Sequence, residues 1–261
     1  MFLVLTVLIL WALYSYLLTF IPVSIYFLFL WVPLGLILAL LTILIFFLLL
    51  VTLSSRKHQN GKFRHFILRN ACYCGIKLFH IKLEIEGKEN VDRNKTYLVV
   101  GNHKSQMDPV MAYYAMHIPC SAVGKSTLFK SKMLTLIGNT FGAVPLNREN
   151  DREAIKSLNI AIKNIKNGLS MIIYPEGGIL SRDYEEMRDL RAGAYKIALK
   201  TGVPVLPIST IGSSKIASKK WYQKKVVKII IHKPVEKEEY EGMSTTELGQ
   251  KCMEIINSSI I

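Results

Sequence analysis

The side chains best suited to acid–base chemistry lie five residues apart, at His103 and Asp108. Histidine has an unperturbed pKa close to neutrality, so it can take up and release a proton under physiological conditions. A carboxylate on one ring nitrogen fixes the tautomer and leaves the other nitrogen free to accept a proton. The sequence contains no serine in a G-x-S-x-G context. The pattern therefore indicates a base, His103, that acts on a hydroxyl supplied by the substrate.

A purely structural interpretation also fits these two residues. Pro109 stands at a position favoured for the first turn of a helix, so Asp108 could simply cap that helix. His103 would then be an ordinary hydrogen-bonded loop residue. The spacing alone does not decide between the two interpretations.

Two further candidates follow predicted strands, where α/β proteins gather their ligands. Arg148 comes after the strand Phe141–Leu146, and a guanidinium binds phosphate through two parallel hydrogen bonds. Glu176 comes after the buried strand Leu169–Tyr174, and Gly177 next to it would allow a ligand close to the backbone.

The elements that position these residues alternate between strands and helices. This alternation predicts an α/β fold with a mixed sheet flanked by helices. The strand Val203–Ile208 contains two prolines and is predicted to lie at an edge or to pair irregularly. Apolar residues at helical spacing predict single helical segments over Ser126–Ile137 and Leu190–Lys200, and Ser244–Glu247 has the capping-box pattern that opens a last helix.

The front of the chain has a different composition. Residues 1–53 contain no Lys, Arg, Asp or Glu, and they form two apolar runs separated near Pro22. Each run reaches the length of about 20 residues that a bilayer core requires. We therefore expect a membrane-embedded helical hairpin over 1–53, a basic juxtamembrane helix over 54–80 and an α/β domain over 81–261. The basic residues after the hairpin place this domain on the cytoplasmic side of a membrane.

The net charge of +14 indicates anionic partners. Next to a membrane anchor, lipid phosphate is the simplest partner, and no nucleic-acid-binding motif supports the alternative. The four cysteines lack the spacing of a zinc or redox motif, so neither a metal nor a disulfide is predicted.

Four blocks in this order resemble the glycerolipid acyltransferase family, which includes the 1-acylglycerol-3-phosphate acyltransferases. The resemblance covers roughly residues 83–234. The blocks are Asn102-His103 through Asp108, Phe141-Gly142 through Arg148, Tyr174-Pro-Glu-Gly177, and Val203-Pro-Val-Leu-Pro207. One departure stands out, because Gly178 and Ile179 occupy the positions where this family commonly has Thr and Arg.

The resemblance implies transfer of an acyl group from a thioester of coenzyme A or acyl carrier protein to the sn-2 hydroxyl of a lysophospholipid. His103 would be the base, Asp108 would support its imidazolium, Arg148 would hold the acceptor phosphate, and Glu176 with Gly177 would position the acceptor. Lys125 would meet the donor's phosphates, and Arg182, Arg188 or Arg191 would replace the missing arginine. No cofactor or metal is implied. Two alternatives stay open: a different lipid acceptor, and a non-catalytic lipid-binding protein at the membrane surface.

Overall fold

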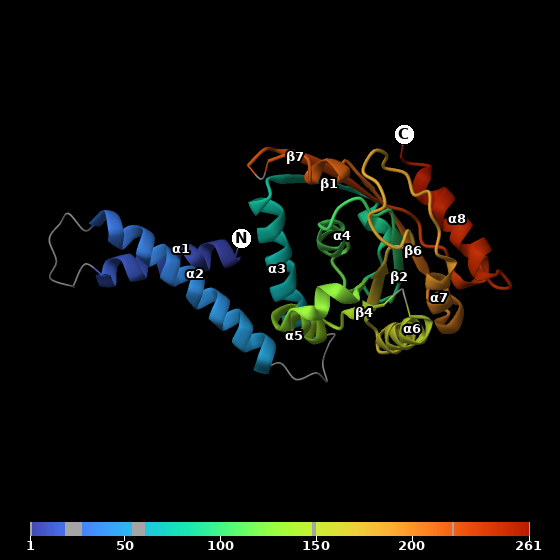
Figure 1. The fold of residues 1–261 in the computed structure, drawn as a ribbon, viewed down its shortest axis with the longest axis horizontal. Helices are drawn as coiled ribbons and strands as arrows, with labels where there is room; N and C mark the ends of the chain where they lie inside the picture. The colour runs from blue at the N-terminus through green and yellow to red at the C-terminus, as the bar shows by residue number, and fades with distance from the viewer. Residues whose placement is uncertain (1, 19–27, 54–60, 148–149, 221, 261) are drawn as a thin grey trace. The chain divides into compact units, whose positions relative to one another are not determined.

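The computed structural model describes residues 2–18, 28–53, 61–147, 150–220 and 222–260. The chain forms two compact units, Met1–His58 and Gln59–Ile261. The elements and their order are shown in Figure 1.

The first unit contains two antiparallel apolar helices, α1 (Phe2–Leu18) and α2 (Leu28–Leu53). They approach closely at Gly35, where an added Cβ would meet the side chain of Ser15. Tyr14 Oη and Thr42 Oγ1 form a hydrogen bond of 3.0 Å between the helices. Gly35 and Ala39 are buried, whereas many of the large apolar side chains are exposed. Small residues four apart at a helix contact allow such close packing.

Among the described residues, no helix combines the length and apolar character needed to cross a membrane.

Within the described residues of the second unit, seven strands form one mixed sheet in the order β1-β7-β6-β2-β5-β3-β4. Strands β2 to β6 run parallel, and β7 is antiparallel to β6. The strands are β1 (Ile81–Glu86), β2 (Leu98–Gly101), β3 (Cys120–Lys125), β4 (Val144–Leu146), β5 (Ser170–Ile173), β6 (Val205–Ile211) and β7 (Lys225–Ile231). The mixed α/β sheet predicted from the sequence is confirmed.

Helices cover both faces of this sheet, and the central strands are therefore buried on both sides. Val99 of β2 packs in a core with α3 and α4, whereas Leu98 and Val100 pack in a second core with α6, α7 and α8. Figure 1 shows α7 and α8 on the opposite side of the sheet from α4. The α-helices are α3 (Lys62–Leu78), α4 (Asp108–Met116), α5 (Lys132–Phe141), α6 (Asp151–Lys166), α7 (Lys196–Thr201) and α8 (Thr245–Asn257), and the 3₁₀ helices are η3 (Lys88–Asn90), η4 (Ser126–Lys130), η5 (Ala192–Tyr195), η6 (Ser214–Ile216) and η7 (Lys237–Glu239).

Strand β6 lies in the middle of the sheet, so the first of the two alternatives predicted for it, an edge strand, was wrong. Pro207 is tolerated there because of its place in the ladder. Its carbonyl accepts a hydrogen bond of 3.0 Å from the His232 amide, directly after β7 ends at Ile231. The amide hydrogen that proline lacks would point to this same side, where the ladder beyond β7 is irregular and resumes at Val205, which exchanges two hydrogen bonds with Val235.

Two predicted single helices are each divided. The segment Ser126–Ile137 consists of η4 and the first part of α5, which are separated by the extended residue Ser131. The segment Leu190–Lys200 begins with η5 before α7 continues it. The predicted capping box is confirmed, since Ser244 and Glu247 exchange hydrogen bonds at the start of α8.

Candidate active site

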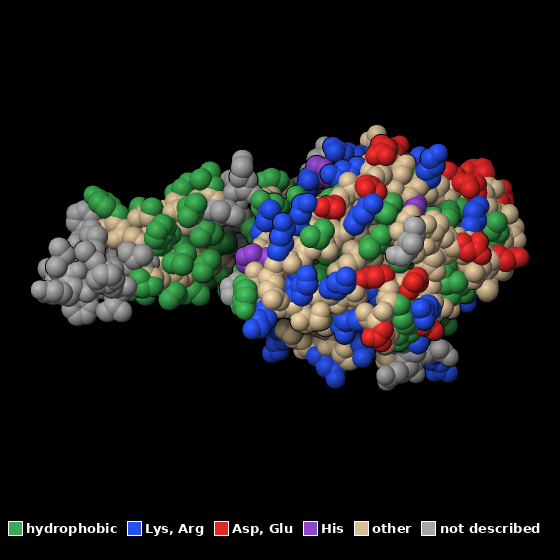
Figure 2. All heavy atoms as spheres, turned by 90° about the horizontal axis from the view of Figure 1, so that it is seen from above, with side chains coloured by type: hydrophobic (Ala, Val, Ile, Leu, Met, Phe, Trp, Pro, Cys, Tyr) green, Lys and Arg blue, Asp and Glu red, His purple; other side chains and the backbone are tan. Residues whose placement is uncertain are grey.

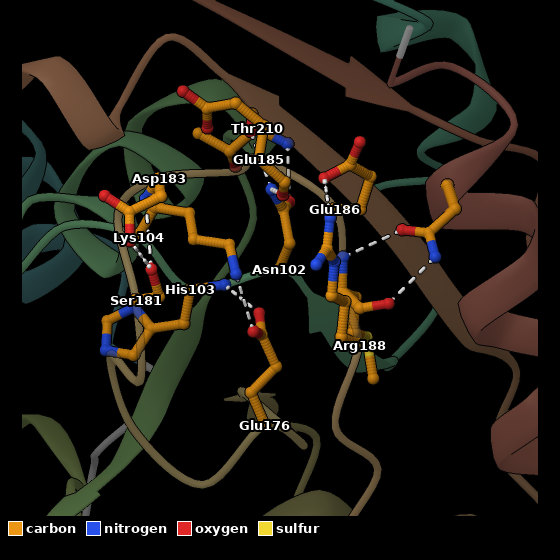
Figure 3. Close-up of polar contacts among 12 residues, drawn as sticks. Asn102, His103, Lys104, Glu176, Ser181, Asp183, Glu185, Glu186, Arg188 and Thr210 are labelled. Atoms are coloured by element: carbon orange, nitrogen blue, oxygen red, sulfur yellow. Dashed lines mark hydrogen bonds and ion pairs between the residues drawn. The ribbon is translucent and has the colours of Figure 1, made fainter.

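The site is built at the carboxyl end of β2, where the strand opens into a loop leading to α4. Asn102 fixes the start of this loop by pairing with the backbone of β6. Its Oδ1 accepts from the Thr210 amide at 2.8 Å, and its Nδ2 donates to the Thr210 carbonyl at 2.7 Å. A third bond of 2.8 Å goes from Nδ2 to the Glu185 carbonyl. The direction of the next residue, His103, is thereby set by a buried amide (Figure 3).

His103 and Asp108 are in direct contact. The Nδ1 atom of His103 lies 3.0 Å from Asp108 Oδ2, and the same oxygen accepts from the backbone amides of Lys104 at 2.8 Å and Ser105 at 2.7 Å. Asp108 is fully buried, whereas 17 % of the His103 side chain is exposed. In the neutral tautomer that donates Nδ1–H to this carboxylate, the free lone pair of the ring would lie on Nε2.

The interpretation of Asp108 as a simple helix cap is wrong. Met107 occupies the capping position of α4, and it makes no side-chain capping bond. The oxygen of Asp108 turns back to the loop and to His103 instead. Three donors on one buried oxygen hold the loop closed around the carboxylate.

A tyrosine that sequence reasoning did not assign packs against His103. The rings of His103 and Tyr174 are stacked, with centroids 4.3 Å apart and planes 18° apart. Burial, and then the charge of Asp108, raise the pKa of Tyr174 well above its usual value, so the phenol stays neutral. The signal that could have found this residue is its position at the start of the Tyr-Pro-Glu-Gly block.

Glu176 supports the loop from the end of β5. Its Oε1 accepts from the His103 amide at 2.6 Å, and its Oε2 forms an ion pair of 2.8 Å with Lys104 Nζ (Figure 3). Burial raises the pKa of Glu176, while the hydrogen bonds from Lys104 and His103 oppose that rise. Both oxygens are occupied and the side chains of the pair are 0 % exposed. Glu176 therefore positions the base loop, and a contact with an acceptor hydroxyl, as expected from the sequence, would require one of these bonds to open.

Lys104 is the second residue that sequence reasoning missed. Its ammonium also lies 4.5 Å from the centre of the Tyr184 ring, and Arg188 covers the same ring at 3.7 Å. The cation is thus held by one carboxylate and one aromatic face without any exposure to water.

The other predicted residues are distributed around this centre. Gly177 has a left-handed backbone, and a Cβ there would collide with the Arg191 side chain. The room that this glycine provides is therefore filled by Arg191, one of the expected arginines. Arg182 is exposed and does not line the cavity beside His103. Arg148 lies outside the described residues.

A cavity of about 650 Å³ opens beside His103. Its lining is mostly apolar and comes from α4, β3, η4, α5 and the loop after β5. Gly178 and Ile179 belong to this lining, and so does the exposed Lys125. Gly178 and Ile179, which depart from the family pattern, therefore line the same cavity as His103. The lining consists of His103, Gln106, Pro109, Ala122, Val123, Gly124, Lys125, Thr127, Leu128, Phe129, Ile137, Gly138, Ala143, Tyr174, Gly178 and Ile179.

Residues 82–211 match the protein family described as Acyltransferase. The computed fold is similar to the crystal structure of the 1-acyl-sn-glycerophosphate acyltransferase PlsC from Thermotoga maritima. The TM-score is 0.67 and the sequence identity 25 %, over 97 % of this chain and 94 % of that one. The chain belongs to the acyltransferase family.

Relatives within the family carry consistent names. A chloroplastic 1-acyl-sn-glycerol-3-phosphate acyltransferase of Arabidopsis thaliana is 35 % identical over 67 % of this chain and 49 % of its own length. Its counterpart in Brassica napus is 33 % identical over 67 % of this chain and 51 % of its own length. A 1-acyl-sn-glycerol-3-phosphate acyltransferase of Borreliella burgdorferi is 28 % identical over 64 % of this chain and 66 % of its own length. The chain thus spans about half the length of the two plant relatives.

Proposed function

We propose that this protein transfers a fatty acyl group from a thioester to the sn-2 hydroxyl of 1-acylglycerol-3-phosphate and so forms phosphatidic acid. The observation that carries the proposal is the His103–Asp108 pair beside an apolar cavity. A base next to apolar space suits the reaction of a hydroxyl with a lipid acyl group. The names of the relatives support the choice of acceptor.

The proposed reaction begins at the free Nε2 atom of His103. This nitrogen takes the proton of the acceptor hydroxyl while the oxygen attacks the thioester carbonyl. The buried carboxylate of Asp108 stabilises the imidazolium that forms. The tetrahedral intermediate then expels the thiolate, which takes the proton back from the imidazolium. The carbon–oxygen bond is formed, the carbon–sulfur bond is broken, and His103 returns to its neutral state.

The acyl chain of the donor would occupy the apolar cavity. Its volume of about 650 Å³ lies within the usual range for ligand pockets, which is about 300–1,000 Å³. Lys125 stands at this cavity with an exposed side chain, where it would meet the phosphates of the donor carried by coenzyme A or by acyl carrier protein.

The acceptor phosphate would bind to arginines around the site. Arg148 is assigned to it by the second block of the family pattern. Arg191, which packs on Gly177 directly after Glu176, is the described arginine best placed to assist. Arg182 is exposed in the same loop region and is the weaker candidate.

We also propose that the first unit attaches the enzyme to a membrane. The outward side chains of the hairpin are almost all large and apolar, and the visible surface of α1 and α2 in Figure 2 is correspondingly hydrophobic. Lys and Arg side chains are spread over the visible surface of the α/β unit in the same view, which suits a cytoplasmic domain near anionic lipid. Exposed apolar groups include Leu5, Leu8, Ile9, Leu13, Leu17, Leu36, Ile37, Leu40, Leu41, Leu44 and Ile45.

A second acceptor is favoured by one observation. Gly178 and Ile179 contribute apolar surface to the cavity at the positions where the family commonly has Thr and Arg. Loss of a positive charge there suits a lysophospholipid whose phosphate carries a further group, because such a diester has a single negative charge.

The experiment that tests the acceptor compares lysophosphatidic acid with lysophosphatidylcholine and lysophosphatidylethanolamine. The full chain in detergent is supplied with labelled acyl-CoA, or with labelled acyl carrier protein. We expect the highest kcat/KM with lysophosphatidic acid. A higher value with either diester would replace it by the second acceptor class, and no transfer to any acceptor would contradict the proposed function.

A further inference from the structure

A second cavity, of about 220 Å³, lies at the opposite end of the β2 strand from His103. His103 follows the carboxyl end of β2, whereas the second cavity is bounded by His117, which precedes β3, and by Lys88, which follows β1. Because β3 is parallel and β1 antiparallel to β2, both of these positions lie at the end of the sheet where β2 begins. Helix α4 separates the two sites, and its length from Asp108 to Met116 is about 12 Å.

The polar part of this second cavity is strongly basic. Arg69, Lys88, Arg93 and His117 line it, together with the apolar side chains of Ile85, Val91 and Met116. Among the described residues, no Asp or Glu lines the cavity, and no ion pair involves any of these four side chains. Asp92 is adjacent in sequence to Arg93, but its Oδ1 accepts from the Asn94 amide and it is absent from the lining.

Aromatic rings hold the most buried of these cations in place. The Arg69 guanidinium lies 5.3 Å from the centre of the Tyr114 ring, which in turn lies 6.0 Å from Tyr73. A guanidinium held against an aromatic face loses little freedom when it binds an anion.

The positive charges around the cavity affect the pKa of His117. Burial first, and then the charges of Arg69 and Arg93, lower the pKa of His117. This residue also has a left-handed backbone with φ of 56°, which is uncommon for a residue other than glycine. Its exposed ring therefore stands in an electropositive position at the end of α4.

We propose that Arg69, Lys88, Arg93 and His117 form a binding site for a phosphomonoester that carries a small remainder. The two guanidiniums can donate paired hydrogen bonds to the phosphate oxygens, and the ammonium and imidazole supply further donors. The cavity is smaller than the range for drug-sized ligands, so its volume suits a phosphate with a glycerol-sized group. The same chemistry occurs in free phosphate compounds and in the headgroup of phosphatidic acid.

This site does not depend on the proposed transfer reaction. Its residues lie at the other end of the β2 strand, and none of them lines the cavity beside His103. A variant that empties the second site should therefore keep the rate of acyl transfer to a soluble or detergent-dispersed acceptor.

The test is a titration of the full chain in neutral detergent, followed through the ring resonances of labelled histidine. Inorganic phosphate and glycerol 3-phosphate are the two probes, and His117→Gln identifies the resonance of His117. We expect that resonance to shift saturably with at least one probe. In Arg69→Gln/Arg93→Gln the apparent Kd should rise at least about 10-fold, since each lost charge-assisted bond is worth that factor or more.

The matched control is Lys196→Gln/Lys200→Gln, which removes the same charge from exposed positions on α7. Its apparent Kd should equal that of the wild type. A His117 resonance that fails to saturate with either probe, or an equal Kd in both double variants, would overturn the proposal. Thermal unfolding of each variant shows whether it is folded. Should Arg69→Gln/Arg93→Gln fail to fold, the Lys88→Gln single variant, changed at an exposed position, takes its place with the same expected direction.

A vesicle arm separates the two sources of the phosphate. If phosphatidic acid is the ligand, Arg69→Gln/Arg93→Gln should co-float less than the control variant with vesicles that contain phosphatidic acid, and equally with phosphatidylcholine vesicles. Equal flotation of the two variants on both vesicles, together with saturable binding of glycerol 3-phosphate, assigns the site to a soluble phosphomonoester.

Discussion

At the scale of single residues, the site depends on one buried oxygen. Asp108 Oδ2 contacts the ring of His103 and accepts from two backbone amides, so it holds both the imidazole and the loop in place. Tyr174 adds a neutral ring that keeps the imidazole flat against the end of β5. The sequence predicted the histidine and the aspartate because their spacing is short and local.

Asp108→Asn removes the negative charge of the carboxylate and keeps the size and shape of the side chain. The amide oxygen can still accept from the loop, but it cannot stabilise the imidazolium that forms during transfer. We expect kcat to fall about 100-fold or more while the KM of the acceptor changes little. Steady-state kinetics measure both constants, and thermal unfolding checks that the variant is folded. An unchanged kcat would show that the carboxylate has no part in the reaction.

At the scale of elements, the loop after β2 and the loop after β5 are locked together. The buried pair of Lys104 and Glu176 joins residues 72 positions apart, and Glu176 also accepts from the His103 amide. Nothing local in the sequence reveals such a pair, because the two blocks meet only when β2 and β5 lie side by side. For the same reason the sequence indicated the strands and most helices, but not the central place of β6, which depends on its pairing with β2 and β7.

Lys104→Met leaves the Glu176 carboxylate buried without its counter-charge. Removing one partner of a buried ion pair typically lowers the free energy of unfolding by about 3–5 kcal/mol. The double variant Lys104→Met/Glu176→Gln removes the stranded charge and should recover at least half of that loss. Urea unfolding of the two single variants and the double variant measures the coupling. Additive losses would contradict a direct interaction between the two side chains.

We also expect the volume of the apolar cavity to limit the length of the acyl chain. A Cβ at Gly124 would have ordinary contacts with Phe129 and Leu128, which line the cavity, and the backbone there does not require glycine. Gly124→Val should therefore fold while it fills part of the space. We expect kcat/KM to fall several-fold more for a long acyl chain than for a short one.

A graded comparison keeps this prediction specific. Gly124→Ala should show the same direction with a smaller effect, because it adds less volume. Equal losses for long and short acyl donors in both variants would show that the chain lies elsewhere.

At the scale of the whole molecule, an almost entirely apolar pair of helices belongs to the same chain as a strongly basic α/β unit. The hairpin buries its small residues and exposes its large apolar ones, which is the reverse of a water-soluble helix pair. An apolar helix pair and a basic domain in one chain suit the proposed reaction, whose acceptor and product are both anionic lipids. The sequence predicted the helices of this unit, and its attachment to a membrane is a proposal that flotation can test.

Ile37→Lys/Ile45→Lys places two charges on the exposed face of α2, where these side chains are 53 % and 63 % exposed. Each lysine is unfavourable in an apolar lipid environment, so binding of the full chain to vesicles should weaken at least about 10-fold. The control Leu180→Lys/Val226→Lys makes the same change at 56 % and 48 % exposed positions of the α/β unit. Equal flotation of both variants would contradict the role of the hairpin.

The central claim is that His103 is the base for acyl transfer. The most direct measurement compares wild type, His103→Ala and Gln106→Ala in the transfer of a labelled acyl group from a thioester to lysophosphatidic acid. Gln106 belongs to the same loop and lines the same cavity, but it cannot act as a base. We predict a loss of about 1,000-fold or more for His103→Ala and a loss below about 10-fold for Gln106→Ala. Wild-type activity in a folded His103→Ala protein would contradict the mechanism.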